Sequence, residues 1–123
     1  MKISLLLILT ILFLFTACSF SKKPIKKNEK YYQTLFCKEK NGMMEHKLKD
    51  KTRVDCLTKK YAIEVDWAKK WAEAVGQSLY YSESTNKKAA IALICSEKDA
   101  RFIRRVKKIA NKFDIKIFII EKE

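Results

Sequence analysis

The chain has 123 residues, of which 48% are apolar, so it can form one small domain with a hydrophobic core. Two glycines and one proline exclude a collagen-like or linker-like polymer. Lys and Arg number 27 against 14 Asp and Glu, and the net charge of +13 favours an anionic partner such as nucleic acid or a phospholipid surface, with an acidic protein as a further option.

Residues 1–17 have the organisation of a signal peptide, because Lys2 precedes an apolar run over residues 3–15. As a helix this run would extend about 20 Å, against about 30 Å of membrane hydrocarbon. Residues 15–18 (Phe-Thr-Ala-Cys) resemble the lipobox of bacterial lipoproteins, with Phe where Leu is usual. The resemblance implies a diacylglycerol on Cys18 and a lipid-anchored protein of the cell envelope. The alternatives are an ordinary signal peptide and, if the run extends to Phe20, an uncleaved anchor.

Residues 18–28 are expected to form a basic tether between this lipid and a domain of residues 29–123. The tether carries Lys22, Lys23, Lys26 and Lys27. It either spaces the domain from the membrane or is attracted to anionic headgroups or another polyanion, by about 1 kcal/mol per basic residue near the surface.

Three cysteines remain if Cys18 carries a lipid. In an oxidising, exported setting we expect one disulfide and one free thiol, with Cys37 and Cys56 as the preferred pair. No two cysteines form a C-x-x-C motif and His46 is the only histidine, so a metal–thiolate site is not expected.

Periodicity predicts one α/β (α+β) domain with the order αβββαβαβ, in which an antiparallel meander and a right-handed parallel crossover share one mixed sheet. Asn28 and Ser96 are expected to cap the first and third helices. The predicted segments are a helix at 28–40, strands at 43–48, 53–57 and 61–66, a helix at 67–81, a loop at 82–88, a strand buried on both faces at 89–95, a helix at 96–112 and a last buried strand at 115–120.

The helix at 96–112 is strongly amphipathic. Its inward residues are expected to be Phe102, Ile103, Val106, Ile109, Ala110 and Phe113, and its outward residues Arg101, Arg104, Arg105, Lys107 and Lys108. The outward arginines and Lys108 are candidates for phosphate contacts, although a run of charges is also typical of a solvated helix face.

Hairpin register predicts a row of carboxylates across the meander. If Lys59 and Lys60 form a two-residue loop, Asp55 lies opposite Glu64, and a preceding turn centred on Asp50 places Glu45 opposite Asp55. Opposed like charges destabilise a sheet by about 0.2–1 kcal/mol each. Either a divalent cation offsets this repulsion, or Arg53 and nearby lysines neutralise a solvated face. The opposite face would carry Val54, Cys56, Ile63 and Val65.

The same residues resemble the core of the PD-(D/E)XK nuclease superfamily. The resemblance covers residues 28–95 and consists of Arg53-Val-Asp55, Glu64-Val-Asp66 and, on the next helix, Gln77-Ser-Leu-Tyr-Tyr81. It implies a restriction-endonuclease-like fold in which Asp55 and Glu64 bind Mg²⁺ or Mn²⁺, joined by Glu45, while Gln77 lies beside the site. Asp66 stands where the superfamily has a lysine. Some members supply this lysine from the adjoining helix, and Lys70 is the candidate here, with Lys69 the runner-up.

The sequence therefore favours an exported, lipid-anchored, metal-dependent nuclease that hydrolyses phosphodiesters of nucleic acid, taken first as DNA. The alternative is an inactive nuclease-fold lipoprotein that binds nucleic acid or another envelope partner. In the simplest structural interpretation Asp66 caps the second helix, Lys70 is a surface charge, and Gln77 and Tyr81 occupy a half-exposed helix face.

Overall fold

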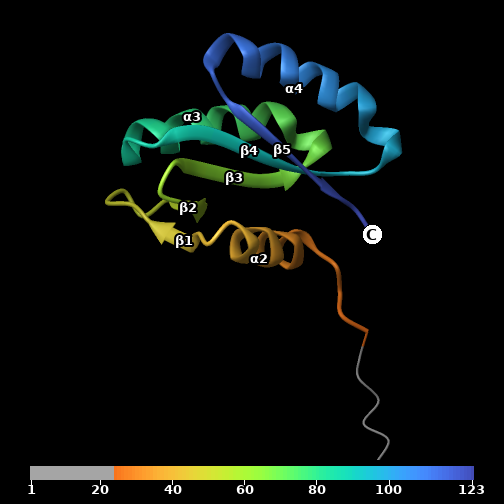
Figure 1. The fold of residues 1–123 in the computed structure, drawn as a ribbon, viewed down its shortest axis with the longest axis horizontal. Helices are drawn as coiled ribbons and strands as arrows, with labels where there is room; N and C mark the ends of the chain where they lie inside the picture. The colour runs from red at the N-terminus through yellow and green to blue at the C-terminus, as the bar shows by residue number, and fades with distance from the viewer. Residues whose placement is uncertain (1–23) are drawn as a thin grey trace, which may run out of the picture.

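A five-stranded mixed sheet forms the centre of the computed structural model, which describes residues 24–123 (Figure 1). The predicted signal peptide, Cys18 and the first part of the tether lie outside the described residues. The elements in chain order are α2 (Glu29–Glu39), β1 (Met43–Lys47), β2 (Arg53–Leu57), β3 (Tyr61–Trp67), the 3₁₀ turn η2 (Ala68–Lys70), α3 (Trp71–Thr85), β4 (Lys88–Cys95), the 3₁₀ turn η3 (Glu97–Asp99), α4 (Ala100–Phe113) and β5 (Lys116–Glu121).

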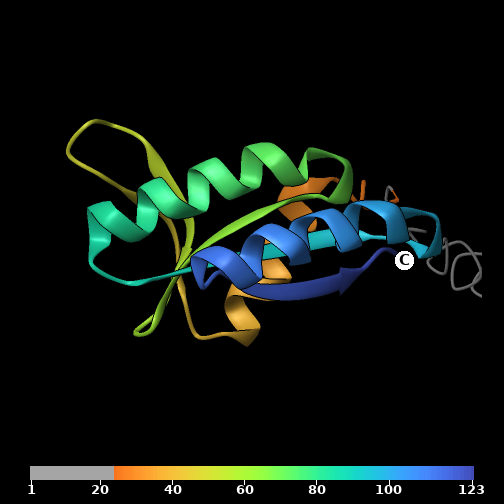
Figure 2. The ribbon, with the colours of Figure 1, turned by 90° about the horizontal axis from the view of Figure 1, so that it is seen from above.

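The strands follow one another across the sheet in the order β1-β2-β3-β4-β5. The first three are antiparallel, and β3, β4 and β5 are parallel. Helix α2 covers one face, while α3 and α4 lie side by side on the other (Figures 1 and 2). This arrangement confirms the predicted order of elements and the mixed α+β sheet. Among residues 24–123, no helix is both long enough and apolar enough to cross a membrane.

Separate apolar cores lie on the two faces. Beneath α2, Phe36 packs with Ile63, Val65 and Ile94. Beneath α3 and α4, a second core is formed by Ala74, Ala89, Ile91, Leu93, Val106, Ala110 and Ile115. Because both faces are covered, β4 is buried from Ala89 onward, as its continuous apolar sequence predicts.

The predicted disulfide and helix caps are confirmed. Cys37 of α2 and Cys56 of β2 are bonded and fully buried, with their Cα atoms 5.5 Å apart, while Cys95 is a free, buried thiol. Asn28 Oδ1 accepts the Tyr31 N–H at 3.0 Å. Ser96 N donates to Asp99 Oδ2 at 2.8 Å, within a reciprocal capping box before α4.

The predicted helix at 67–81 is shifted along the chain. Strand β3 continues to Trp67, because its parallel ladder with β4 extends to the pair Trp67↔Ile94. Asp66 is therefore a strand residue, and its Oδ1 accepts the Trp67 N–H at 2.8 Å instead of capping a helix. At the other end α3 runs to Thr85, so most of the predicted loop at 82–88 is helical and only two residues connect α3 to β4.

Two predictions of burial near the C-terminus are wrong. The last strand is predicted to be buried, but β5 is an edge strand in which every residue is exposed or only partly buried, and Ile119 is 46% exposed. Helical periodicity places Phe113 inward, yet it is 49% exposed. Phe113 is the last residue of α4, just before Asp114 adopts a left-handed conformation that reverses the chain.

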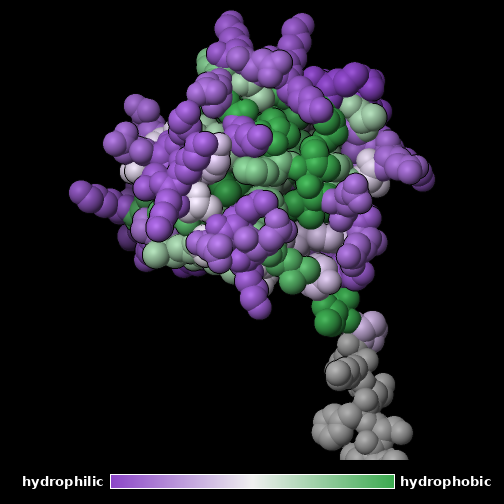
Figure 3. Space-filling view, viewed as in Figure 1, coloured by the Kyte–Doolittle hydropathy of each residue, from purple (hydrophilic) through white to green (hydrophobic). Residues whose placement is uncertain are grey.

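The face of the molecule drawn in Figure 3 has apolar side chains in its middle, surrounded by hydrophilic ones.

Candidate carboxylate site

Strands β2 and β3 separate where the acidic residues begin. Their backbone pairing comprises Cys56↔Ile63 and Leu57↔Ala62, and the next step in this register is Asp55 beside Glu64. There the Val65 N–H donates to Asp55 Oδ2 at 2.9 Å, so a side chain takes the place of a strand carbonyl. The pairs Met44↔Cys56 and His46↔Val54 likewise place Glu45 opposite Asp55. The observed pairs have both predicted registers, but Glu45–Asp55 and Asp55–Glu64 are not themselves backbone pairs, and Glu45 has a left-handed backbone conformation with a φ of 53°.

The separation of β2 from β3 also changes the packing of one residue, Val54, from that predicted. Cys56, Ile63 and Val65 share the core beneath α2, as expected. Val54 does not join them and packs instead with Ala62 and Tyr81 in a small third core. The prediction for Val54 requires regular pairing through this segment, whereas the backbone pairing of β2 with β3 stops at Cys56.

Four acidic residues meet at this opening, and we call them the carboxylate cluster: Glu29, Asp55, Glu64 and Asp66. Glu64 and Asp66 are only 5% and 3% exposed, and Asp55 is half-buried. Lys70 is partly exposed and forms ion pairs with two of these acids. Its Nζ lies 3.4 Å from Asp66 Oδ1 and 3.9 Å from Glu29 Oε2. The structure thus joins two of the three acids of the predicted metal site, Asp55 and Glu64, to two further acids, one of which begins α2.

Burial and mutual repulsion make this cluster electrostatically unfavourable. Burial, followed by the charges of Asp55 and Asp66, raises the pKa of Glu64 to about 9. Burial raises the pKa of Asp55 to about 6, and burial together with Asp66 raises the pKa of Glu29 to about 7. Glu64 Oε2 is buried without a hydrogen-bond partner. A buried acceptor left in this way costs about 1–3 kcal/mol, and more if it is charged.

Glu45 lies beside the cluster but is already neutralised. Its Oε1 accepts from Lys30 Nζ at 2.6 Å and from Gln33 Nε2 at 2.8 Å, and Arg53 lies 3.8 Å from its other oxygen. The hydrogen bonds from Lys30 and Gln33 hold the pKa of Glu45 below its ordinary value. Gln33 also donates to the Asp55 carbonyl at 3.0 Å, so this buried residue, which sequence reasoning missed, holds α2 against β2.

Helix α3 brings the predicted Gln77 and Tyr81 to the same region. Burial raises the pKa of Tyr81, a hydrogen bond from Gln77 lowers it, and the charges of Glu64 and Asp55 raise it further. Asp66 belongs to β3 and Lys70 to the 3₁₀ turn η2, so neither lies on the helix that carries Gln77 and Tyr81. Lys69 is exposed, and among residues 24–123 only Lys70 of these two lysines forms an ion pair with a carboxylate.

The predicted phosphate-contacting residues lie apart from the cluster, on the outer face of α4. Arg101, Arg104, Arg105 and Lys108 are all exposed. The Arg101 guanidinium lies over the Phe102 ring, 4.6 Å from its centroid. Helix α4 contacts η2, the turn that contains Lys70. The arrangement leaves these four cations accessible to solvent.

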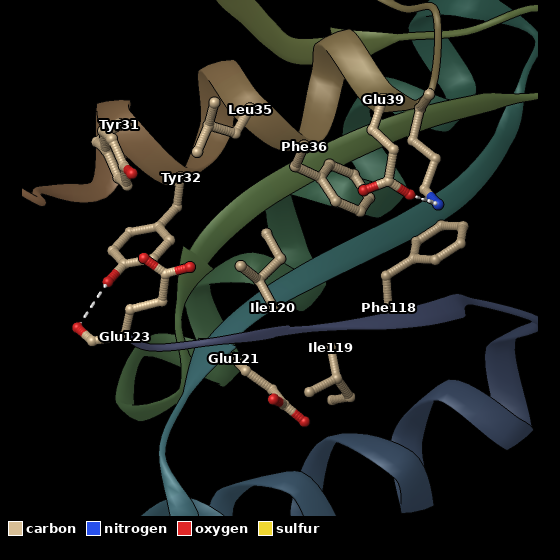
Figure 4. A pocket seen from close by; sticks show the side chains of 11 residues that line it. Tyr31, Tyr32, Leu35, Phe36, Glu39, Phe118, Ile119, Ile120, Glu121 and Glu123 are labelled. Carbon is tan, nitrogen blue, oxygen red and sulfur yellow. Dashed lines mark hydrogen bonds and ion pairs between the residues drawn. The ribbon is translucent and has the colours of Figure 1, made fainter.

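A groove of about 310 Å³, lined by both apolar and charged side chains, runs between α2 and β5 (Figure 4). Tyr32, Phe36, Phe118 and Ile120 are among its lining residues, and Tyr32 Oη donates to the Glu123 carbonyl at 3.4 Å. The carboxylate cluster does not line this groove. Within residues 24–123, no three His, Cys, Asp or Glu side chains are arranged as a ready metal site.

Comparison with known proteins finds no matching family model, no matching curated protein and no matching solved structure. The features that bear on function are therefore the chemistry of the cluster and the sequence motif that its residues form.

Proposed function

We propose that this protein is an exported, lipid-anchored, metal-dependent nuclease that hydrolyses phosphodiester bonds of nucleic acid at the carboxylate cluster. The supporting observation is the unpartnered, buried oxygen of Glu64 next to Asp55, at the point where β2 and β3 separate. Burial of Asp55 and Glu64 side by side lowers the stability of the folded chain, and a bound cation would offset this loss.

The residues present fit a magnesium-like ion. Mg²⁺ is commonly held by one or two carboxylates together with water and substrate phosphates, so a site need not contain three protein acids. Asp55 and Glu64 would hold the ion, and Glu45 is less suited because Lys30, Gln33 and Arg53 already neutralise its carboxylate. When bound, such an ion lowers the pKa of a coordinated water and stabilises negative charge on a phosphoryl oxygen.

Lys70 and Gln77 would position the other reacting groups. The charges of Asp66 and Glu29 raise the pKa of Lys70, so its amine remains a cation next to the acids. From this place it can bind a phosphate oxygen or orient a water. Asp66 then serves to hold the lysine, which explains an acid at the position where PD-(D/E)XK nucleases have a lysine.

A second function, binding without cleavage, is favoured by the ion pairs of Lys70. This lysine lies within 4 Å of both Asp66 and Glu29, and it must leave one of these partners to reach a substrate. If these pairs persist, the nuclease-like motif would belong to a lipoprotein that binds nucleic acid or another envelope partner.

Titration calorimetry of Mg²⁺ or Mn²⁺ into the full-length chain, purified in detergent, tests the metal site. We expect binding in the wild type, loss of binding in Asp55→Ala, and unchanged binding in Glu97→Ala, which removes an exposed acid outside the cluster. An absence of binding, even with DNA present, would contradict the nuclease proposal and favour the binding protein.

A cleavage assay with Mg²⁺ then tests the role of Lys70. Lys70→Ala should reduce the cleavage rate by about 10²–10⁴-fold, the usual contribution of a positioned proton-transfer or charge-stabilising group. Lys69→Ala removes the same charge one residue away and should retain activity. Equal rates for the two variants would remove Lys70 from the mechanism.

A further inference from the structure

The turn between β1 and β2 packs beside the C-terminal half of α3 and leaves a hollow of about 420 Å³. Its volume is within the range of small-ligand sites. The hollow is separate from the carboxylate cluster, and its lining residues are His46, Lys47, Leu48, Lys49, Asp50, Tyr80 and Ser84.

Two sets of contacts hold this turn in place. Leu48 packs against the third core, which contains Val54, Ala62 and Tyr81. Asp50 Oδ1 accepts the N–H of Thr52 at 3.0 Å and its hydroxyl at 2.6 Å, while the Tyr80 hydroxyl donates to Asp50 Oδ2. The hydroxyl of Tyr80 thus connects α3 to the turn.

The chemistry of the hollow fits an unpaired nucleic-acid strand. Tyr80 is 46% exposed, which leaves its ring accessible for stacking. Lys47 and Lys49 are exposed on the rim, and the charge of Asp50 is already engaged by three hydrogen bonds. Proteins that bind single strands combine an aromatic ring, on which a base stacks, with cations that contact the backbone phosphates.

The hollow is linked to the proposed active site through neighbouring residues of α3 and β2. Tyr81 follows Tyr80 on α3, and the charges of Glu64 and Asp55 act on its hydroxyl. On the other side, Arg53 begins β2 directly after the turn and lies 3.8 Å from Glu45, the residue opposite Asp55. A strand stacked on Tyr80 would have to extend past Tyr81 or Arg53 to reach the carboxylate cluster.

We propose that the β1–β2 turn and Tyr80 bind single-stranded nucleic acid, and that an unpaired strand is the substrate of the carboxylate site. The second clause rests on the proposed nuclease function, whereas the binding itself requires neither metal nor cleavage.

Fluorescence polarisation of the full-length chain in detergent and EDTA tests the proposal. The probe is a fluorescein-labelled thymidine oligonucleotide of about 12 nucleotides, a length within known single-strand site sizes. Tyr80→Ala should weaken binding by roughly 5–100-fold, the affinity equivalent of removing one base–aromatic stack. Tyr80→Phe keeps the ring but removes the hydrogen bond to Asp50, and should bind within about twofold of the wild type if stacking dominates.

A charge-matched pair of variants tests the rim lysines. The double variant Lys47→Ala/Lys49→Ala should weaken binding more than the double variant Lys59→Ala/Lys60→Ala. The second variant removes the same charge from the exposed turn at the other end of β2. Thermal unfolding followed by circular dichroism verifies that each variant is folded.

Unchanged affinity in folded Tyr80→Ala, equal losses of affinity in the two lysine pairs, or tighter binding of a duplex of the same sequence would each overturn the proposal. These outcomes are distinct from failure of the nuclease function, which the calorimetric and cleavage experiments measure separately. Tyr80-dependent binding without Mg²⁺ binding would support the strand-binding surface and contradict the nuclease.

Discussion

Glu64 is the residue at which stability and proposed function conflict most clearly. It is 5% exposed, it lies among three other acids, and one of its oxygens has no partner. The folded chain keeps a proton on Glu64 up to about pH 9, whereas the unfolded chain releases it near the ordinary value of 4.5. Between these values the unfolded state binds fewer protons, so stability falls as the pH rises.

Replacement of Glu64 by glutamine should therefore stabilise the metal-free protein in a pH-dependent manner. At pH 8 in EDTA we expect Glu64→Gln to raise the free energy of unfolding by about 1–3 kcal/mol. Near pH 4.5 the difference should be small, because Glu64 is then protonated in the folded state and about half protonated in the unfolded state. Urea denaturation at the two pH values measures the effect.

Glu73→Gln provides the matched control, since Glu73 is an exposed glutamate of α3. It should change stability little at either pH. A Glu64→Gln variant that is less stable than the wild type at pH 8 would contradict the electrostatic account of the cluster, and with it the argument for a cationic ligand.

At the scale of elements, the junction between α2 and β1 depends on a single glycine. Gly42 lies against the disulfide that joins α2 to β2, and a Cβ at this position would be 2.3 Å from Cys56 Sγ and 2.7 Å from Cys37 Sγ. Its φ is not positive, so the requirement is for space and not for an unusual backbone conformation. The disulfide and Gln33 together hold α2 on the strand that carries Asp55.

Alanine substitutions at the two glycines should have opposite effects. Gly42→Ala overpacks the disulfide and should lower the free energy of unfolding by about 1–3 kcal/mol. Gly76→Ala lies in α3, where an added Cβ meets nothing within 4 Å, and should raise it by about 0.5–1 kcal/mol through better helix propensity. Chemical denaturation under non-reducing conditions measures both. A neutral Gly42→Ala would mean that the junction can relax around the disulfide.

At the scale of the whole molecule, the excess of positive charge is spread over several exposed segments. The tether precedes α2, the β1–β2 turn borders the proposed strand site, and the outer face of α4 carries exposed arginines and lysines. Such a distribution favours weak, salt-sensitive attraction to a polyanion over a large area. The same charge would attract the domain to anionic lipid headgroups if Cys18 is lipidated.

Salt dependence can separate the contribution of α4 from that of the stacking site. Arg104→Ala with Arg105→Ala should weaken oligonucleotide binding for every sequence and reduce the slope of log affinity against log salt by about 1 for each phosphate that is no longer neutralised. Tyr80→Ala should lower affinity with little change in slope, because stacking releases no counterions. An unchanged slope in the α4 variant would assign its arginines to a solvated face.

The order of the elements follows from local patterns in the sequence. The apolar run of β4, the amphipathic helices, the caps at Asn28 and Ser96 and the short turns of the meander each show the expected structure. Hairpin register could also be predicted, since loop length fixes which residues face each other. The predicted disulfide between Cys37 and Cys56, one of three possible pairs in the domain, is also confirmed.

The wrong predictions concern segments whose structure depends on residues far away in the sequence. Parallel pairing with β4 extends β3 through Trp67 and delays the next helix, and the position of β5 at the sheet edge exposes Ile119. Neither effect is visible in a local window, because periodicity does not reveal which strand will be a neighbour.

The sequence by itself determined the register of the meander, and with it that Asp55 and Glu64 fall beside each other, because register follows from side-chain alternation and turn length. Only the tertiary structure placed Glu29 and Asp66 with Asp55 and Glu64, positioned Lys70 between two acids, and neutralised Glu45 through α2. These relations depend on the packing of a helix against a sheet opening, and the resulting burial gives the carboxylates their raised pKa values.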